Sequence, residues 1–214
     1  MRPRTRTLAG VLVGTVVFAV GQTASAQPSI VGHAHDFSTK GFAKGEICLP
    51  CHTPHNSVAD ETGAFVDPLW NHELTTATYT MFEGNTGDAL NDFDQVSRMC
   101  MSCHDGTVAL DSFGGTPGSI FIDTEHLIGT DLRNDHPVGS AAVYPLSGDA
   151  DFRAAVNDRL GPNSELELEP LDVNGVTERV VSCNTCHTPH YKGFAEQLRM
   201  SNTASALCLS CHIK

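Results

Sequence analysis

The eight cysteines of this 214-residue chain are spaced for one kind of covalent chemistry. They form four pairs, with two residues between the partners and a histidine directly after the second cysteine. The pairs are Cys48 and Cys51, Cys100 and Cys103, Cys183 and Cys186, and Cys208 and Cys211. The histidines that follow them are His52, His104, His187 and His212. Because Cys-x-x-Cys-His is the attachment signature of haem c, and no cysteine is left over, the sequence predicts four covalently bound haems.

This spacing has a mechanical reason. In one helical turn, residues three and four positions apart share a face, so two thiols can bind the vinyl groups on one porphyrin edge while the histidine becomes the proximal iron ligand. Zinc ribbons also pair Cys-x-x-Cys units but need no histidine after each, and a thioredoxin-like site needs only one pair. Disulfides within such short pairs would cross-link almost nothing. The sequence therefore favours haem attachment over these alternatives.

The remaining histidines are candidates for the sixth ligands. Eleven histidines less four proximal ones leave seven, which are His33, His35, His55, His72, His126, His136 and His190. Four irons need at most four sixth ligands, so every haem can be bound by two histidines. Such closed, low-potential irons transfer electrons and do not bind substrate. The methionines are interpreted as packing residues.

Two of these candidates share a motif. His55 and His190 both end a Cys-His-Thr-Pro-His stretch, three residues after a proximal histidine. At that offset a side chain cannot fold over its own haem, but it can bind a neighbouring one. We therefore assign His55 to the haem of Cys100 and Cys103, and His190 to the haem of Cys208 and Cys211.

For the other two irons the sequence gives only an order of preference. His136, in Asn-Asp-His-Pro-Val-Gly, comes first because it lies in a long stretch without cysteine. His35 follows because an N-terminal tail could reach a haem of its own chain or of the next subunit. His72, after Pro-Leu-Trp-Asn, is the third candidate. His33 and His126 are interpreted as surface histidines.

The first residues predict export. Three arginines precede an uncharged, apolar run over residues 8–20, and Ala24-Ser25-Ala26 comes next. This is the pattern of a secretory signal peptide over residues 1–26, and a 13-residue run is too short to remain as a membrane anchor. The mature chain, 27–214, would carry 10 basic and 25 acidic residues, which argues against nucleic-acid binding. We expect a secreted protein, in the periplasm or at the extracellular surface.

The motifs repeat as a two-haem module. It covers roughly residues 46–106 and 181–214, with a cysteine-free spacer over 107–180. The mature chain supplies 47 residues per haem, which predicts a multihaem cytochrome c fold. We expect this fold to be loop-rich, with few short helices, minimal strand and a core built around four stacked haems. Within the spacer we expect one short helix at 151–160 and a strand at 165–169. The acidic stretch 83–94 is interpreted as a solvated loop, with a divalent-cation site as the alternative.

The chain resembles the extracellular tetrahaem c-type cytochromes of metal-reducing bacteria, including those that form haem-wire filaments. The resemblance extends over nearly the whole mature chain. The matching segments are Ala34-His-Asp-Phe-Ser, Cys51-His-Thr-Pro-His-Asn, Pro68-Leu-Trp-Asn-His, Cys103-His-Asp-Gly-Thr-Val-Ala, Ile128-Gly-Thr-Asp-Leu, His136-Pro-Val and Ser205-Ala-Leu-Cys-Leu-Ser-Cys-His-Ile-Lys. The resemblance implies closely paired bis-histidine haems, and in filament members one axial histidine comes from the adjacent subunit. His35 is the candidate for that role.

These observations predict an electron-transfer protein and not an enzyme. Its expected partners are redox proteins or extracellular electron acceptors, and copies of the chain that associate head-to-tail into a filament. A soluble periplasmic shuttle is the second hypothesis, with the same haems and no self-assembly. A small haem reductase is the third, and it would need one iron with an open face.

Overall fold

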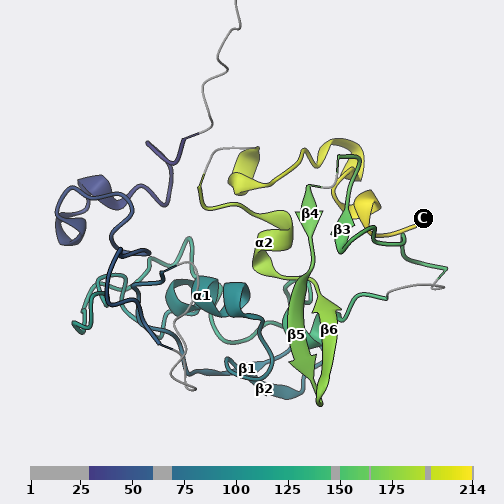
Figure 1. Cartoon of the computed structure of the whole chain (residues 1–214), viewed down its shortest axis with the longest axis horizontal. Coiled ribbons are helices and arrows are strands. Elements are labelled where there is room, and N and C mark those ends of the chain that lie inside the picture. Colours follow the sequence, from purple (N-terminus) through teal and green to yellow (C-terminus); the bar gives the residue numbers. More distant parts are fainter. Residues whose placement is uncertain (1–28, 60–68, 146–149, 164, 191–193, 214) are drawn as a thin grey trace, which may run out of the picture.

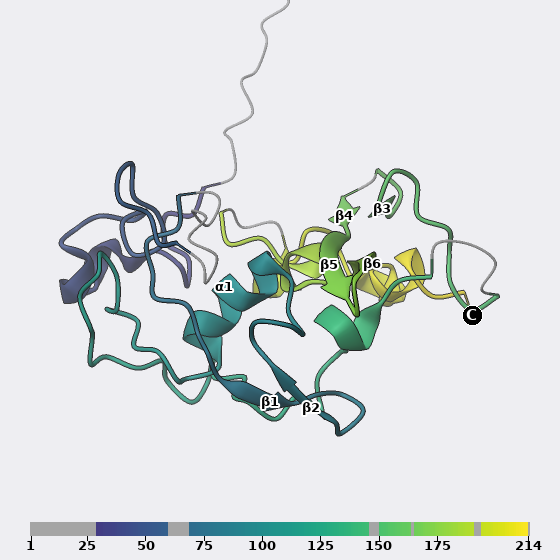
Figure 2. The same ribbon diagram turned by 60° about the horizontal axis from the view of Figure 1, so that its bottom comes forward.

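A computed structural model describes residues 29–59, 69–145, 150–163, 165–190 and 194–213. The predicted signal peptide, residues 1–26, lies outside the described residues. In Figures 1 and 2 the N-terminal segment lies on the left, and strands β3 to β6 lie on the right with the C-terminal segment. Among the described residues, no helix has the length and apolar character needed to cross a bilayer.

Regular secondary structure is sparse, which confirms the predicted loop-rich character. Helix α1 spans Gln95–His104 and helix α2 spans Cys183–Cys186. The strands are β1 Thr78–Thr80, β2 Thr86–Asp88, β3 Arg159–Leu160, β4 Leu166–Glu167, β5 Glu169–Val173 and β6 Val176–Val180. Single turns of 3-10 helix lie at Phe37–Thr39, Gly41–Ala43, Gly139–Ala142, Ala195–Gln197, Thr203–Ser205 and Cys208–Ser210.

Helix α1 begins at a well-formed cap. The carboxylate of Asp94 accepts hydrogen bonds from the amides of Val96 and Ser97, which would otherwise lack partners at the helix start. The helix ends at His104, so it carries the whole second Cys-x-x-Cys-His motif. Helix α2 is a single turn that carries the cysteines of the third motif, and it packs against α1.

The strands form three antiparallel pairs, β1–β2, β3–β4 and β5–β6. Asn174 and Gly175, with φ of 56° and 81°, form the two-residue loop between β5 and β6. Positive φ at both positions matches the twist of a tight hairpin, and glycine accepts it without strain. The expected strand at 165–169 is present as β4 and the start of β5. Its apolar residues Leu166 and Leu168 are buried.

The expected helix at 151–160 is wrong. Asn157 and Asp158 have φ of 50° and 60°, in the left-handed region, so the chain turns there instead of continuing a helix. Val156 and Arg159 pair across this turn, and Arg159 starts β3. The segment therefore forms a hairpin turn. Its residue Phe152 packs on His212 of the C-terminal motif.

The apolar core consists of small clusters. One cluster joins Tyr79, Met81, Ala89, Phe93, Met101 and Leu132. A second joins Tyr144, Leu160, Leu166, Leu168, Val181 and Met200, and a third contains Trp70 and Met99. Four methionines thus pack in the core. The carboxylates of the acidic stretch close local turns: Asp88 accepts from the amides of Leu90 and Asn91.

Candidate functional site

Each Cys-x-x-Cys-His motif is folded as a helical turn. The amide of the histidine donates to the carbonyl of the first cysteine in three motifs, at N–O distances of 2.8 Å (His52 to Cys48), 3.0 Å (His187 to Cys183) and 2.9 Å (His212 to Cys208). In the second motif the same residues close helix α1. This turn places both thiols and the imidazole on one face, as attachment of a porphyrin requires.

All eight cysteines are free of disulfide bonds, and none is fully buried. Their thiols are therefore available for thioether formation. Burial raises the pKa of Cys51 and of Cys186 to about 11, so these thiols stay protonated at neutral pH in the absence of haem. Among the described residues, no group of three or more His, Cys, Asp or Glu side chains is arranged to hold a metal ion.

Two of the proximal imidazoles, His104 and His187, are oriented for metal binding by hydrogen bonds from Nδ1. Nδ1 of His104 donates to the carbonyl of His126 at 2.9 Å, and Nδ1 of His187 donates to the carbonyl of Glu196 at 2.8 Å. A hydrogen bond from Nδ1–H to a carbonyl leaves the lone pair of Nε2 for a metal ion and fixes the ring. The sequence did not predict this role for the carbonyls of His126 and Glu196.

Three proximal histidines face a second imidazole. The ring centroids of His52 and His190 lie 6.0 Å apart, with their planes inclined by 25°. His104 and His35 lie 6.0 Å apart at 69°. His212 and His136 lie 6.5 Å apart at 67°. We call these the three imidazole pairs.

These separations fit an iron bound on both sides. A metal bond of about 2 Å to each imidazole nitrogen, with the ring centroid roughly 1 Å further on, places two axial rings about 6 Å apart. The second imidazoles are also oriented like the proximal ones. Nδ1 of His35 donates to Oε1 of Gln197 at 2.8 Å, and Nδ1 of His136 donates to the carbonyl of Pro137 at 2.8 Å. Both rings thus keep Nε2 free for iron.

The pairing differs from the one expected from sequence proximity. His190 lies beside the first motif and not the fourth, because the second module packs its Cys-His-Thr-Pro-His stretch against the first module. His35 occupies the place beside His104 that was assigned to His55. His136 lies beside His212, the histidine of the fourth motif. His55 and His187 are exposed and have no imidazole neighbour among the described residues.

The other three histidines lie outside the pairs. His72 is buried, with Nδ1 2.8 Å from the carbonyl of Glu73 and Nε2 2.9 Å from the carbonyl of Ala109. Burial lowers its pKa. His126 is an exposed histidine whose Nδ1 lies 2.7 Å from Oδ1 of Asp123, and this carboxylate raises its pKa. His33 is half-exposed.

Neighbouring motifs lie near one another in chain order. The pKa of Cys103 is raised by burial and further by the nearby Cys51 thiol. The thiols of Cys100 and Cys183 share a hydrogen bond, which raises the pKa of Cys100. Cys211 is close enough to Cys186 to raise its pKa as well. The first motif thus adjoins the second, the second adjoins the third, and the third adjoins the fourth.

Large apolar side chains surround the proximal histidines yet remain exposed to solvent. Leu69, beside the first motif, is 50% exposed, and Ile128, whose amide donates to the carbonyl of His104, is 44% exposed. Leu209 and Ile213 flank His212 in the same way. Exposed apolar clusters of this kind mark binding surfaces, and a porphyrin is apolar enough to cover them. The residues present therefore fit haem c.

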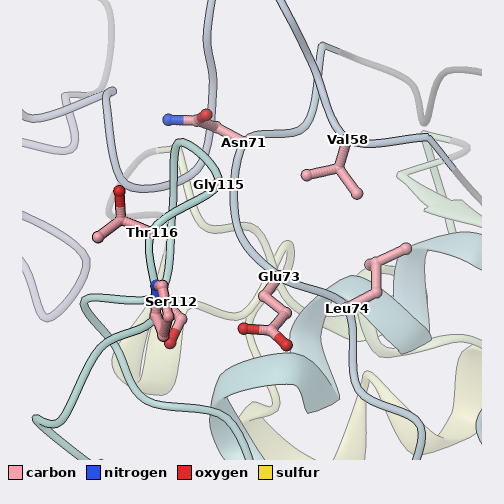
Figure 3. A pocket seen from close by; sticks show the side chains of 8 residues that line it. Val58, Asn71, Glu73, Leu74, Ser112, Gly115 and Thr116 are labelled. Atoms are coloured by element: carbon pink, nitrogen blue, oxygen red, sulfur yellow. The ribbon is translucent and has the colours of Figure 1, made fainter.

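A cavity of about 350 Å³ lies apart from the imidazole pairs. Figure 3 shows Glu73 between Ser112 and Leu74, with Val58 and Asn71 above them. Its lining contains no cysteine and no histidine. The cavity therefore offers neither a thioether nor an imidazole, and the chemistry of this protein is concentrated at the motifs.

Comparison with known protein families gives one match. Residues 175–214, which hold the third and fourth motifs, match the family model described as the doubled CXXCH motif. No curated protein matches the chain. The C-terminal module is thus similar to haem-binding modules of c-type cytochromes. This similarity supports covalent haem c binding and electron transfer in general, and it favours an electron carrier over an enzyme.

Proposed function

We propose that the chain is a tetrahaem c-type cytochrome that transfers electrons outside the cytoplasm, with each iron held between two histidines. The observation that carries this proposal is the set of three imidazole pairs, at centroid separations of 6.0, 6.0 and 6.5 Å, each containing a motif histidine. When bound, haem c supplies a reversible one-electron couple at its iron. At the three paired motifs, two axial histidines would close the iron to substrate, which supports a carrier. The iron of the third motif would take its second histidine from another copy of the chain.

The chain's own residues have three tasks in this function. The cysteines fix the porphyrin edge, and the paired histidines close the axial positions. Hydrogen bonds from Nδ1 hold the rings of His35, His104, His136 and His187 and would increase their basicity. The closeness of successive motifs supports a row of four haems in chain order, so that electrons would enter at one end of the row and leave at the other.

Two histidines without an imidazole neighbour among the described residues favour a filament subunit over the other forms. His55 and His187 are exposed and lack an imidazole neighbour among the described residues, whereas His35 is engaged within its own chain. His55 therefore replaces His35 as the candidate for a ligand supplied between copies. Such head-to-tail contacts generate an open fibre. Extracellular electron acceptors or redox proteins would be the partners at its ends.

A soluble periplasmic shuttle is the second candidate. It is favoured by the fact that three of the four motif histidines already find their partner within one chain. The acidic composition suits docking to a basic redox protein.

The test is expression of the full chain in a host that matures c-type cytochromes. We expect a mass equal to the mature chain plus four haems, and low-spin ferric spectra. Fewer haems would contradict the proposal. Negative-stain microscopy of the same material then separates the two forms, because filaments support the polymer subunit, and particles of uniform size at every concentration support the shuttle.

A further inference from the structure

The segment 69–75 joins the first motif to the second through its backbone. The amide of Thr53 donates to the carbonyl of Leu69 at 3.0 Å, and the amide of Asn71 donates to the carbonyl of Cys51 at 2.9 Å. At the other end, the amide of Thr75 donates to Oγ of Ser102 in helix α1 at 2.9 Å. We call residues 69–75 the connecting segment.

Side chains of the connecting segment contact both the cavity and the motifs. Asn71, Glu73 and Leu74 line the cavity shown in Figure 3. Asn71 also donates to the carbonyl of Leu49 in the first motif, and Trp70 and His72 contact the first and second motifs.

Trp70 and His72 form a continuous contact between the two motifs. The indole of Trp70 lies edge-on to the ring of His52, with centroids 6.0 Å apart. The ring of His72 lies 6.4 Å from Trp70, and its Nε2 lies 3.6 Å from Sγ of Cys103. The contact therefore leads from a proximal histidine of the first motif to a thioether-forming sulfur of the second.

The indole nitrogen of Trp70 lacks an acceptor. Trp70 is 9% exposed and packs with Met99 and Cys51, and its Nε1 has no hydrogen-bond partner among the described residues. Burial of an unpaired N–H group is unfavourable, so native proteins supply an acceptor in nearly every case. Around the first motif, the group that remains to be added is haem, and its carboxylates are strong acceptors.

His72 is engaged in a way that does not suit an iron ligand. Both of its ring nitrogens lie within hydrogen-bond distance of backbone carbonyls, at 2.8 Å and 2.9 Å. A ligand would need one nitrogen for the iron, as His35, His104 and His136 have, whose hydrogen bonds are made through Nδ1.

We propose that Trp70 and His72 are positioning residues for the haems of the first and second motifs: the indole N–H of Trp70 donates to a haem carboxylate, and His72 supports the sulfur of Cys103. This inference rests on the proposed function, since it requires haem at both motifs. Donors at the haem periphery stabilise the electron-richer ferrous state. Their removal therefore lowers a reduction potential and leaves the axial ligands in place.

The test uses the haem-loaded full chain and the variants Trp70→Phe, His72→Phe and His72→Gln. His33→Gln is the matched control, because His33 is half-exposed and lies outside the imidazole pairs. We expect every variant to keep four haems and all-low-spin spectra. Spectroelectrochemical titration should show at least one potential shifted downward in Trp70→Phe and in His72→Phe. The His72→Gln variant keeps a donor and should shift less, and the control should match the wild type.

A measurement on the wild type covers the case in which a variant fails to mature. Trp70 is the only tryptophan, so its indole N–H gives a single resonance. In the reduced protein this resonance should exchange slowly with solvent and show cross-relaxation to a haem propionate. A rapidly exchanging resonance without that contact overturns the proposal for Trp70. Unchanged potentials in the variants, or a high-spin haem in His72→Gln, overturn it for the pair.

Failure of the proposed function is distinguishable from failure of this inference. Wild-type protein without four low-spin haems would contradict the function before any variant is made. Wild-type protein with four such haems, combined with one of the contrary results above, would leave the function intact and remove only the role of Trp70 and His72.

Discussion

The imidazole rings of His52 and His190 lie stacked, with centroids 6.0 Å apart and planes inclined by 25°. His52 belongs to the first motif, and His190 follows the third motif by three residues. An iron between these rings would be bound by both modules of the chain at once. The first haem would therefore act as a cross-link between the two halves, in addition to carrying electrons.

Replacement of His190 with alanine should open this iron. The variant should keep four covalent haems, because all the cysteines remain, but one haem should become high-spin. Electron paramagnetic resonance and the visible absorption of the ferric protein would detect the change. An all-low-spin spectrum identical to that of the wild type would show that His190 is not a ligand, and His33→Ala provides the control for a histidine outside the imidazole pairs.

The helical turn of each motif could be predicted from the sequence because it is local. Cys-x-x-Cys-His specifies its chemistry within five residues, and one helical turn suffices to arrange them. The loop-rich fold also followed from the small number of residues per haem. The structure of 151–160 could not be predicted, because its apolar spacing suits a helix as well as a hairpin. The left-handed backbone at Asn157 and Asp158 makes it a hairpin turn.

The pairing of the imidazoles could not be predicted, because it depends on packing between distant segments. His190 meets His52 only because α2 packs on α1, and His35 is oriented by Gln197, a residue 162 positions away. The sequence assigned two histidines, His55 and His190, each to the haem of the following motif. Because the two modules pack together, His190 lies beside His52 and His35 lies beside His104 instead.

Gln197 should control the strength of the His35 ligand. Its Oε1 accepts from Nδ1 of His35 at 2.8 Å, and loss of such a partner typically weakens a metal ligand by about 10- to 100-fold. We expect Gln197→Leu to let carbon monoxide bind one haem of the reduced protein more readily than in the wild type. Difference spectra under carbon monoxide measure this effect.

The matched control for this prediction is Gln197→Glu, which keeps an acceptor oxygen at the same place. This variant should resemble the wild type in its carbon monoxide spectra. Equal carbon monoxide binding by Gln197→Leu and the wild type would indicate that packing alone orients His35.

Tyr79 should stabilise the fold through a buried hydrogen bond beside the second motif. Its hydroxyl donates to Oδ2 of Asp105 at 2.6 Å, and Thr75 donates to the same oxygen at 2.6 Å. Burial, followed by this carboxylate, raises the pKa of Tyr79, so the hydroxyl remains a donor well into the alkaline range. Replacement with phenylalanine should lower the free energy of unfolding by about 1–3 kcal/mol, because the carboxylate loses one donor.

Denaturant titration of the haem-loaded protein, followed by far-ultraviolet circular dichroism, measures this loss. Phe82→Leu is the control, because the side chain of Phe82 is exposed and its replacement should change stability much less. A free energy of unfolding equal to that of the wild type in Tyr79→Phe would mean that water replaces the lost donor.

Asp94 should be the most sensitive residue between the two modules. Its buried carboxylate accepts from the amides of Val96 and Ser97 and from the hydroxyls of Ser97 and Ser182. Ser182 is the N-cap of α2, so one side chain closes the start of α1 and binds the start of α2. Replacement with alanine removes the cap and leaves buried donors unpaired, and it should cost about 2–4 kcal/mol.

The matched variant is Asp94→Asn, which keeps a capping oxygen and should lose less stability than Asp94→Ala. Both are compared by denaturant titration with Asp88→Ala, whose carboxylate caps only a local turn. Because Asp94 joins α1 to α2, its loss should also disturb the His52–His190 pair and increase the high-spin fraction in the ferric spectrum. A loss of stability equal to that of Asp88→Ala, with unchanged spectra, would show that the modules are held together by other contacts.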